Sequence, residues 1–128
     1  MTARVQNNGL ANITAAWHAY TSRALYLQWG TGSGAAASAN VVTTTTTTEA
    51  RTTGTSSQQT TTQTSDTYRV TGTVTALGTR AITEVGVFDA VGSGSPPTGG
   101  NMDIYGDFTV INLAINDSIA FTVNVAFT

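Results

Sequence analysis

The side chains that could do acid–base chemistry are few and scattered along the sequence. His18 is the only histidine, and its neighbours are Trp17 and Tyr20 rather than a nucleophile or a carboxylate. Asp103 and Asp107 share one face of an extended segment, but four residues on a strand span about 13 Å. The two carboxyl groups of a glycosidase stand about 5–9 Å apart. A hydrolytic site would need acids from different strands, so the sequence favours structural roles for these residues.

Phosphate and metal chemistry have equally little support. The Gly30-x-Gly32-x-Gly34 segment follows a predicted strand, as phosphate-binding loops do, but the chain has no lysine to complete such a loop. It also has no cysteine, which excludes disulfides, zinc–thiolate sites and cysteine nucleophiles. No D-x-D-x-D-G loop is present for calcium. We therefore expect no cofactor, no metal and no small-molecule substrate.

The overall charge argues against nucleic-acid and membrane partners. Charged residues make up 9% of the 128 residues, and the net charge is −2, whereas about a quarter of an average soluble domain is charged. Five arginines without lysine cannot supply the many phosphate contacts on which nucleic-acid affinity depends. No apolar run resembles a signal-peptide core or a membrane span. We expect no nucleic acid, no membrane and no export.

Threonine is the most unusual feature of the composition. It accounts for 27 of the 128 residues, and 18 of these lie between Thr43 and Thr79. Polar tracts of low complexity are often disordered, because they bury too little apolar surface to offset the entropy of ordering. Threonine is β-branched, however, and suits a strand with one wet face. We favour the second interpretation and predict two long solvated strands, near 41–53 and 56–65, that turn around Gly54.

Most of the remaining chain alternates between apolar and polar residues, which is the pattern of half-buried strands. Strands are predicted at 23–29, 67–77, 80–88 (apolar on both faces), 102–113 and 119–127 (a core strand). A loop rich in glycine and proline fills 89–100, and Asn116-Asp117 marks a turn. Apolar residues at near-helical spacing predict a short helix over 9–19.

This series of short strands predicts an all-β fold, because turn signals recur about every ten residues. We expect one domain over 1–128 with the architecture of a β-sandwich or jelly roll. Residues 1–22 would form an N-terminal arm or a short helix, and residues 41–65 the Thr-rich segment. Nothing repeats at a fixed period over the whole chain, which argues against a solenoid.

A set of segments has a distinctive sequence: 29–32, 66–76, 80–90, 100–102, 106–108, 111–113 and 117–122. The run Ile-Thr-Glu-Val-Gly-Val-Phe-Asp-Ala, followed by a Gly-rich turn and Gly-Asp-Phe, resembles segments of small virion structural proteins of tailed bacteriophages. The resemblance covers most of residues 25–127. Two positions depart from it: Tyr105 stands where we expect arginine, and the turn at Asn116-Asp117 lacks the expected glycine.

The resemblance implies a non-enzymatic structural component of a bacteriophage virion, assembled in the cytoplasm of the bacterial host. The first expectation is a capsid decoration (cement) protein whose partners are the major capsid protein, copies of itself, or both, with a trimer as one arrangement. Arg80 and Glu84 are charges on an otherwise apolar strand, so we expect them to pair or to face a subunit boundary. The candidate interface residues are Trp17, Trp29, Arg80, Glu84 and Tyr105.

The sequence leaves other functions open. Within the virion, the alternative is a tail or baseplate component, or the base of a fibre. A host-glycan binding module would use Trp29 and Tyr68 as stacking platforms for sugar rings. An enzyme is the third and weakest alternative, because no nucleophile, base and carboxylate occur in a recognised pattern.

Overall fold

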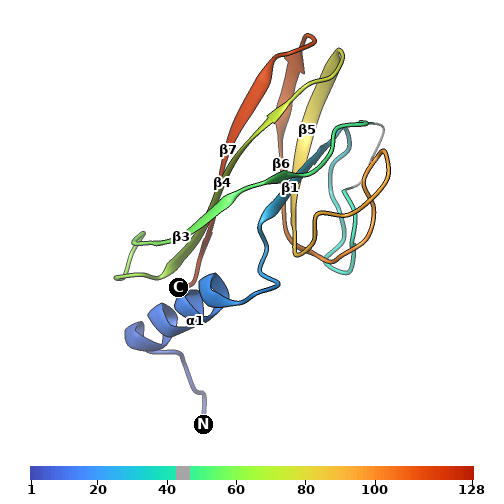
Figure 1. Ribbon diagram of the computed structural model, residues 1–128. Helices are drawn as coiled ribbons and strands as arrows, with labels where there is room; N and C mark the ends of the chain where they lie inside the picture. The colour runs from blue at the N-terminus through green and yellow to red at the C-terminus, as the bar shows by residue number, and fades with distance from the viewer. Residues whose placement is uncertain (43–46) are drawn as a thin grey trace.

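The computed structural model describes residues 1–42 and 47–128, whose strands form two antiparallel sheets packed as a sandwich (Figure 1). One sheet has the strand order β2 (Thr52–Thr53), β1 (Tyr26–Gly30), β5 (Arg80–Phe88) and β6 (Met102–Leu113). The other has the order β3 (Thr55–Gln59), β4 (Thr67–Thr75) and β7 (Ser118–Ala126). Helix α1 (Asn7–Ala19) packs against β3 and β4. The predicted all-β sandwich with a short N-terminal helix is confirmed.

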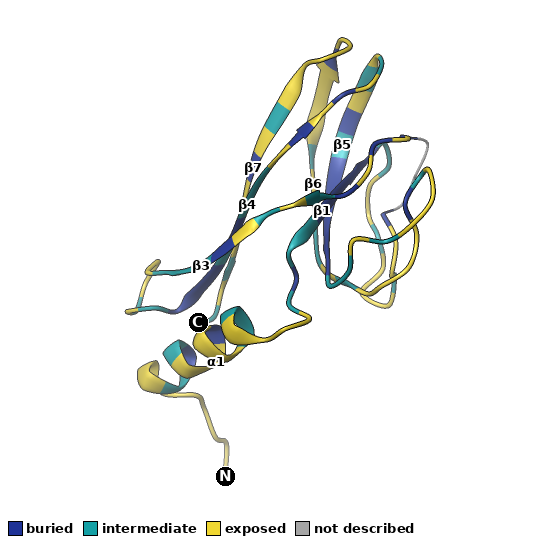
Figure 2. Ribbon diagram, viewed as in Figure 1, coloured by how far each residue is buried: buried dark blue, intermediate teal, exposed yellow. Residues whose placement is uncertain are grey.

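The alternation along β4 shows how the sequence builds the core. Tyr68, Val70 and Val74 are buried between the sheets, whereas Thr73 and Thr75 are exposed. Leu27 and Trp29 of β1, among other side chains, meet them from the opposite sheet. Each large apolar side chain that is fully buried contributes about 1.5–3 kcal/mol. Figure 2 shows the buried positions gathered in the strands and the exposed ones on much of α1 and in the loops.

Strand β5 is covered on both faces, as the sequence predicts. Val85 and Val87 belong to the core between the sheets. On the other face, the guanidinium of Arg51 lies 3.5 Å from the centre of the Phe88 ring. A Cβ atom added at Gly86 would lie 3.0 Å from Val42. The chain before β2 therefore supplies a second layer over this part of β5.

Strand β7 contributes to the core as predicted, but it lies at the edge of its sheet. It pairs along its whole length with β4 and with no other strand that the structure describes. Its apolar side chains do face inward, but only Phe121 is buried, and Ile119, Val123 and Val125 are half-buried. An edge strand has a neighbour on one side only, so its inward side chains remain partly accessible.

The Thr-rich segment differs from the prediction in three respects. The strands are short, Thr52–Thr53 and Thr55–Gln59, and residues 43–46 lie outside the described part of the chain. The segment 47–51 is not solvated on both faces, because Thr47, Glu49 and Arg51 are buried. Gly54 does not turn a hairpin: β2 pairs with β1 in one sheet and β3 with β4 in the other, so the chain passes between sheets here.

Gly54 sits where no side chain fits. A Cβ atom at this position would lie 2.8 Å from the backbone oxygen of Thr71 and 2.8 Å from Leu27 Cδ1. We expect Gly54→Ala to lower the free energy of unfolding by about 2 kcal/mol, because backbone atoms cannot move aside cheaply. Urea denaturation measures the change, with Gly106→Ala as the control, since a Cβ there meets nothing within 4 Å. Equal stability of the two variants would contradict this account.

Candidate functional site

Glu49 lies at the centre of a buried polar cluster. Its Oε1 accepts hydrogen bonds from the amide of Leu77 and from Nε of Arg80, both at 2.9 Å, and its Oε2 accepts one from Nε1 of Trp29 at 3.3 Å. The Glu49 side chain is 4% exposed and that of Arg80 is 20% exposed. Burial raises the pKa of Glu49, but these donors and the Arg80 charge outweigh it, so the pKa is lowered. The ionised carboxylate joins the segment before β2 to β1 and β5.

Glu84 is fully buried in β5. Its carboxylate accepts hydrogen bonds from the amide of Gly32 at 3.1 Å and from the hydroxyl of Tyr105 at 2.9 Å. Asp107, on the neighbouring strand, accepts one from the amide of Gly34 at 3.0 Å. Both acids thus position the loop that follows β1. Arg80 does not pair with Glu84, although both lie on β5, because it pairs with Glu49 instead.

Arg51 organises the loop between β5 and β6. Its Nη1 donates to the carbonyl oxygens of Ala90 and Gly99, both at 2.8 Å, and its Nε donates to Gln28 at 2.9 Å. Burial lowers the pKa of Arg51, and the nearby Asp89 charge opposes that shift. The sequence predictions do not include Glu49 or Arg51. The signal that could have found them is the alternation of Thr47, Glu49 and Arg51 at every second residue.

His18 contacts a serine that is 38 residues away in the sequence. Its Nδ1 lies 2.9 Å from Oγ of Ser56, and Nε of Arg23 donates to the same oxygen at 3.0 Å. A catalytic serine needs a base that a carboxylate orients. Among the described residues, no hydrogen bond joins a carboxylate to His18, and the arginine occupies the serine oxygen. The contacts join the end of α1 to β3, which favours a structural role for His18.

Two acids from different elements do line one cleft, which is what a hydrolytic pair would require. The cleft has a volume of about 470 Å³ and includes Trp17, Tyr20, Asp89 and Asp103 in its wall. Burial and the Asp89 charge raise the pKa of Asp103. Both oxygens of Asp89, however, accept hydrogen bonds from Asn101, at 2.7 and 2.8 Å. Asp89 therefore serves to close the loop before β6.

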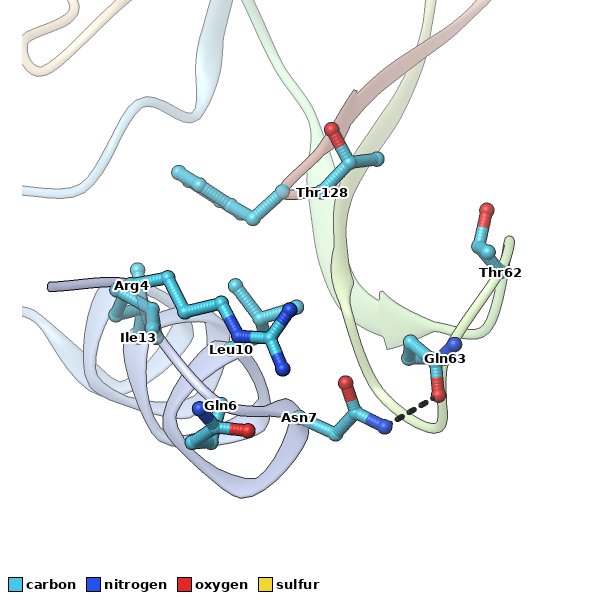
Figure 3. Close-up of a pocket in the computed structure, with 10 residues that line it drawn as sticks. Arg4, Gln6, Asn7, Leu10, Ile13, Thr62, Gln63 and Thr128 are labelled. Carbon is cyan, nitrogen blue, oxygen red and sulfur yellow. Dashed lines mark hydrogen bonds between the residues drawn. The ribbon is translucent and has the colours of Figure 1, made fainter. Parts of the chain in front are cut away.

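A larger cavity, of about 700 Å³, lies where the two ends of the chain meet (Figure 3). Its wall includes apolar Leu10 and Ile13 from α1 together with Arg4 from the N-terminal arm. Asn7 donates to Gln63 across it at 2.7 Å. This contact connects the start of α1 to the turn before β4, so the cavity wall belongs to three separate segments of the chain.

The five predicted interface residues do not form one surface. Trp29 and Glu84 are buried, with exposed fractions of 1% and 0%. Trp29 belongs to the core between the sheets, and Glu84 is covered by the loop after β1 and by Tyr105. Trp17 is half-buried against the core. Arg80 and Tyr105 are largely buried and bond to different acids, Arg80 to Glu49 and Tyr105 to Glu84. Tyr68, with Trp29 the predicted sugar platform, is 0% exposed. That glycan interpretation is wrong for these rings, because stacking requires an open ring face.

Asp66 holds the turn between β3 and β4. Its carboxylate accepts hydrogen bonds from the amides of Gln63 at 2.7 Å and of Thr61 and Thr62 at 2.9 Å, and from the hydroxyl of Thr67 at 2.8 Å. These donors, the Gln63 amide foremost, hold the pKa of Asp66 far below its usual range. The ionised group therefore stabilises the fold above the ordinary aspartate pKa, about 4.

This stabilisation is lost as the pH falls below about 4 towards the lowered pKa of the folded state. We expect Asp66→Asn to be less stable than the unmodified protein at pH 7 and to lose less stability on acidification. Urea midpoints at neutral and acid pH measure both effects. Asp89→Asn is the comparison, because the Asn101 amide and side chain lower the pKa of Asp89 in the same direction. If the urea midpoints of Asp66→Asn and of the unmodified protein fell equally on acidification, the stabilising role assigned to ionised Asp66 would be contradicted.

In the part of the chain that the structure describes, no three or more His, Cys, Asp or Glu side chains gather where they could hold a metal ion. No helix there is long and apolar enough to cross a bilayer. Comparison of the chain with protein-family models, with curated proteins and with solved structures finds no match.

Proposed function

We propose that this protein is a non-enzymatic structural component of a tailed-bacteriophage virion, specifically a capsid decoration protein that binds and stabilises the head shell. The observation that carries the proposal is the use the fold makes of its charged side chains. Glu49, Arg51 and Asp66 are buried and bonded to strands and loops of their own chain. These three charged side chains thus fix the sandwich, as a building block requires.

Two of the segments that resemble virion proteins lie on neighbouring strands, which supports the proposal. Ile-Thr-Glu-Val-Gly-Val-Phe-Asp-Ala makes up most of β5, and Gly-Asp-Phe lies on its neighbour β6. The two runs pair directly, with Glu84 opposite Asp107 and Val85 opposite Gly106. The residues that carry the resemblance thus lie in one pair of adjacent strands of this chain rather than in separate loops.

The low charge of the chain fits assembly beside many copies. With a net charge of −2 over 128 residues, little repulsion accumulates when copies are packed together. Exposed threonines, such as Thr73, Thr75 and Thr122, supply neutral hydrogen-bonding groups in place of charges. Such a surface can approach a repeating shell without a penalty from like charges.

The test is the position of the protein in the particle. Electron microscopy of particles with and without the protein should show its density on the outside of the head, and purified protein should bind expanded capsids that lack it. Density at the tail or baseplate would overturn the head assignment in favour of a tail component. Failure to bind any part of the particle would overturn the virion proposal itself.

A further inference from the structure

Among residues 1–42 and 47–128 the sandwich has four edge strands, and three of them are protected against pairing with another chain. Natural proteins protect an edge by keeping it short, by covering it, by bulges or by charges. β2 has two residues, and β3 has five and packs against α1. β6 has two register shifts against β5 and carries the exposed charges of Asp103 and Asp107. Each of these edges is a poor template for a new strand.

β7 has none of these protections. Its nine residues pair with β4 in unbroken register, without a bulge, and include no charged residue, no proline and no glycine. An open groove of about 420 Å³ runs beside it, with Phe108 of β6 and Ile119 of β7 in its wall. Figure 1 shows β7 along the outside of the three-stranded sheet. A long, regular and uncharged edge of this kind favours strand addition.

The hydrogen bonds at its two ends show which backbone groups of β7 are available. The amide of Phe127 donates to Asp66 at 3.0 Å, and the oxygen of Asp117 accepts from Ala76 at 2.8 Å, so these odd-numbered residues face β4. In an antiparallel ladder, alternate residues direct their amide and carbonyl to opposite sides. The even-numbered residues therefore face the open edge: Ser118, Ala120, Thr122, Asn124 and Ala126. Their side chains are all exposed and all small.

We propose that β7 is the docking surface for a second copy of this chain, which adds its own β7 in antiparallel orientation about a two-fold axis at Thr122. Thr122 is the middle residue of the strand, so this register overlaps all nine residues. In this register Thr122 lies opposite Thr122 of the second copy, and Ala120 lies opposite Asn124 of the second copy. Each pair that faces the edge can exchange two backbone hydrogen bonds.

The same register is favourable on the inner face of the sheet. It places Phe121 opposite Val123 of the second copy, and Ile119 opposite Val125. Apolar pairs between such neighbouring strands stabilise a sheet. Ile119, Val123 and Val125 are half-buried in the single chain, so pairing removes their remaining surface from water. The edge carries no charge, so a two-fold arrangement that sets it against itself meets no repulsion.

This proposal deepens the proposed structural function, on which it rests, by naming a second copy of the chain as the partner at β7. The two proposals can fail separately, because they have different measurements. The β7 pairing is tested by the mass of the protein in solution, and the virion function by binding to the particle. A monomer that binds capsids would overturn the β7 pairing alone. A β7 dimer that binds no part of the particle would overturn the virion function and leave the pairing standing.

Two substitutions at Thr122 test the pairing by sedimentation over a concentration series. Thr122→Pro removes an amide that faces the open edge and leaves the β4 ladder complete. Thr122→Lys sets two like charges against each other at the axis and is expected to raise the dissociation constant about tenfold or more. Thr73→Lys is the matched control, because it adds the same charge to an exposed residue of β4, one strand inward. We expect a dimer of 13.2 kDa subunits that only the Thr122 substitutions weaken.

Amide exchange in the unmodified protein provides a test that no variant's folding can obscure. On concentration, the even-numbered amides of β7 should become protected, whereas the odd-numbered ones are protected by β4 at every concentration. A protein that stays monomeric, a dimer that Thr122→Lys and Thr73→Lys weaken equally, or even-numbered amides that stay unprotected in the dimer would each overturn the proposal. A strand of a different protein bound at β7 would overturn the second copy as its occupant.

Discussion

Glu49→Ala is expected to lower the free energy of unfolding by about 4 kcal/mol, since removing one partner of a buried ion pair leaves the other charge uncompensated. The Arg80 guanidinium would lose its carboxylate, and the indole N–H of Trp29 would lose its acceptor in the core. The amide of Leu77 would lose one as well. Urea or guanidinium denaturation at neutral pH measures the change.

Asp107→Ala is the control for Glu49→Ala, because it removes the same charge at an exposed position. Asp107 accepts a hydrogen bond from the amide of Gly34, so we expect a loss of about 1 kcal/mol or less. Glu49→Gln keeps the shape of the side chain and one hydrogen-bond acceptor. Its loss in the free energy of unfolding should lie between those of Glu49→Ala and Asp107→Ala. If Glu49→Ala costs no more than Asp107→Ala, the cluster around Glu49 does not hold the sandwich together.

Trp17→Ala should have the second largest effect, a loss of about 3 kcal/mol, because this side chain fixes α1 to the sandwich. The Trp17 ring stacks on Tyr68, with the ring centres 4.5 Å apart, and meets Phe127 edge-on at 6.1 Å. Denaturation measures the loss, and amide exchange over residues 7–19 should become faster than in the unmodified protein as the helix detaches.

Tyr20→Ala provides the comparison for Trp17→Ala. Tyr20 is 59% exposed and lies just after the same helix, so its removal should change stability by no more than about 0.5 kcal/mol. The comparison also tests the interface role that the sequence suggests for Trp17. A Trp17→Ala protein with unchanged stability and altered assembly would place Trp17 at a subunit contact instead of in the core.

Local pattern was sufficient where neighbouring residues in the chain decide the structure. The alternation over 67–77 predicts β4 with the correct faces, because successive side chains on a strand point to opposite sides. The alternation over 80–88 predicts β5, but it sets Ile82 opposite Val85 and Val87. The register shift between Ile82 and Glu84 brings all three into the core. The near-helical spacing of apolar residues over 9–19 predicts α1, because residues three and four apart lie on one face of a helix. The turn at Asn116-Asp117 is also correct, and Asn116 has a positive φ of 70°.

The Thr-rich segment was mispredicted because its partners are distant in the sequence. Thr47, Glu49 and Arg51 look solvated when only polarity is considered. In the fold, Glu49 meets Trp29 and Arg80, and Arg51 meets Ala90 and Gly99. A polar side chain is stable inside a protein when it finds such partners, and no local pattern shows whether it will.

Composition and alternation are sufficient to predict a β-sandwich that is rich in threonine and free of lysine and cysteine. Three features depend on the tertiary structure: the unprotected edge at β7, the passage between sheets at Gly54, and the burial of Glu49. A strand's periodicity specifies which face is apolar but not which strand lies beside it. Pairing and the burial of charge depend on contacts between segments that the chain brings together only when it folds.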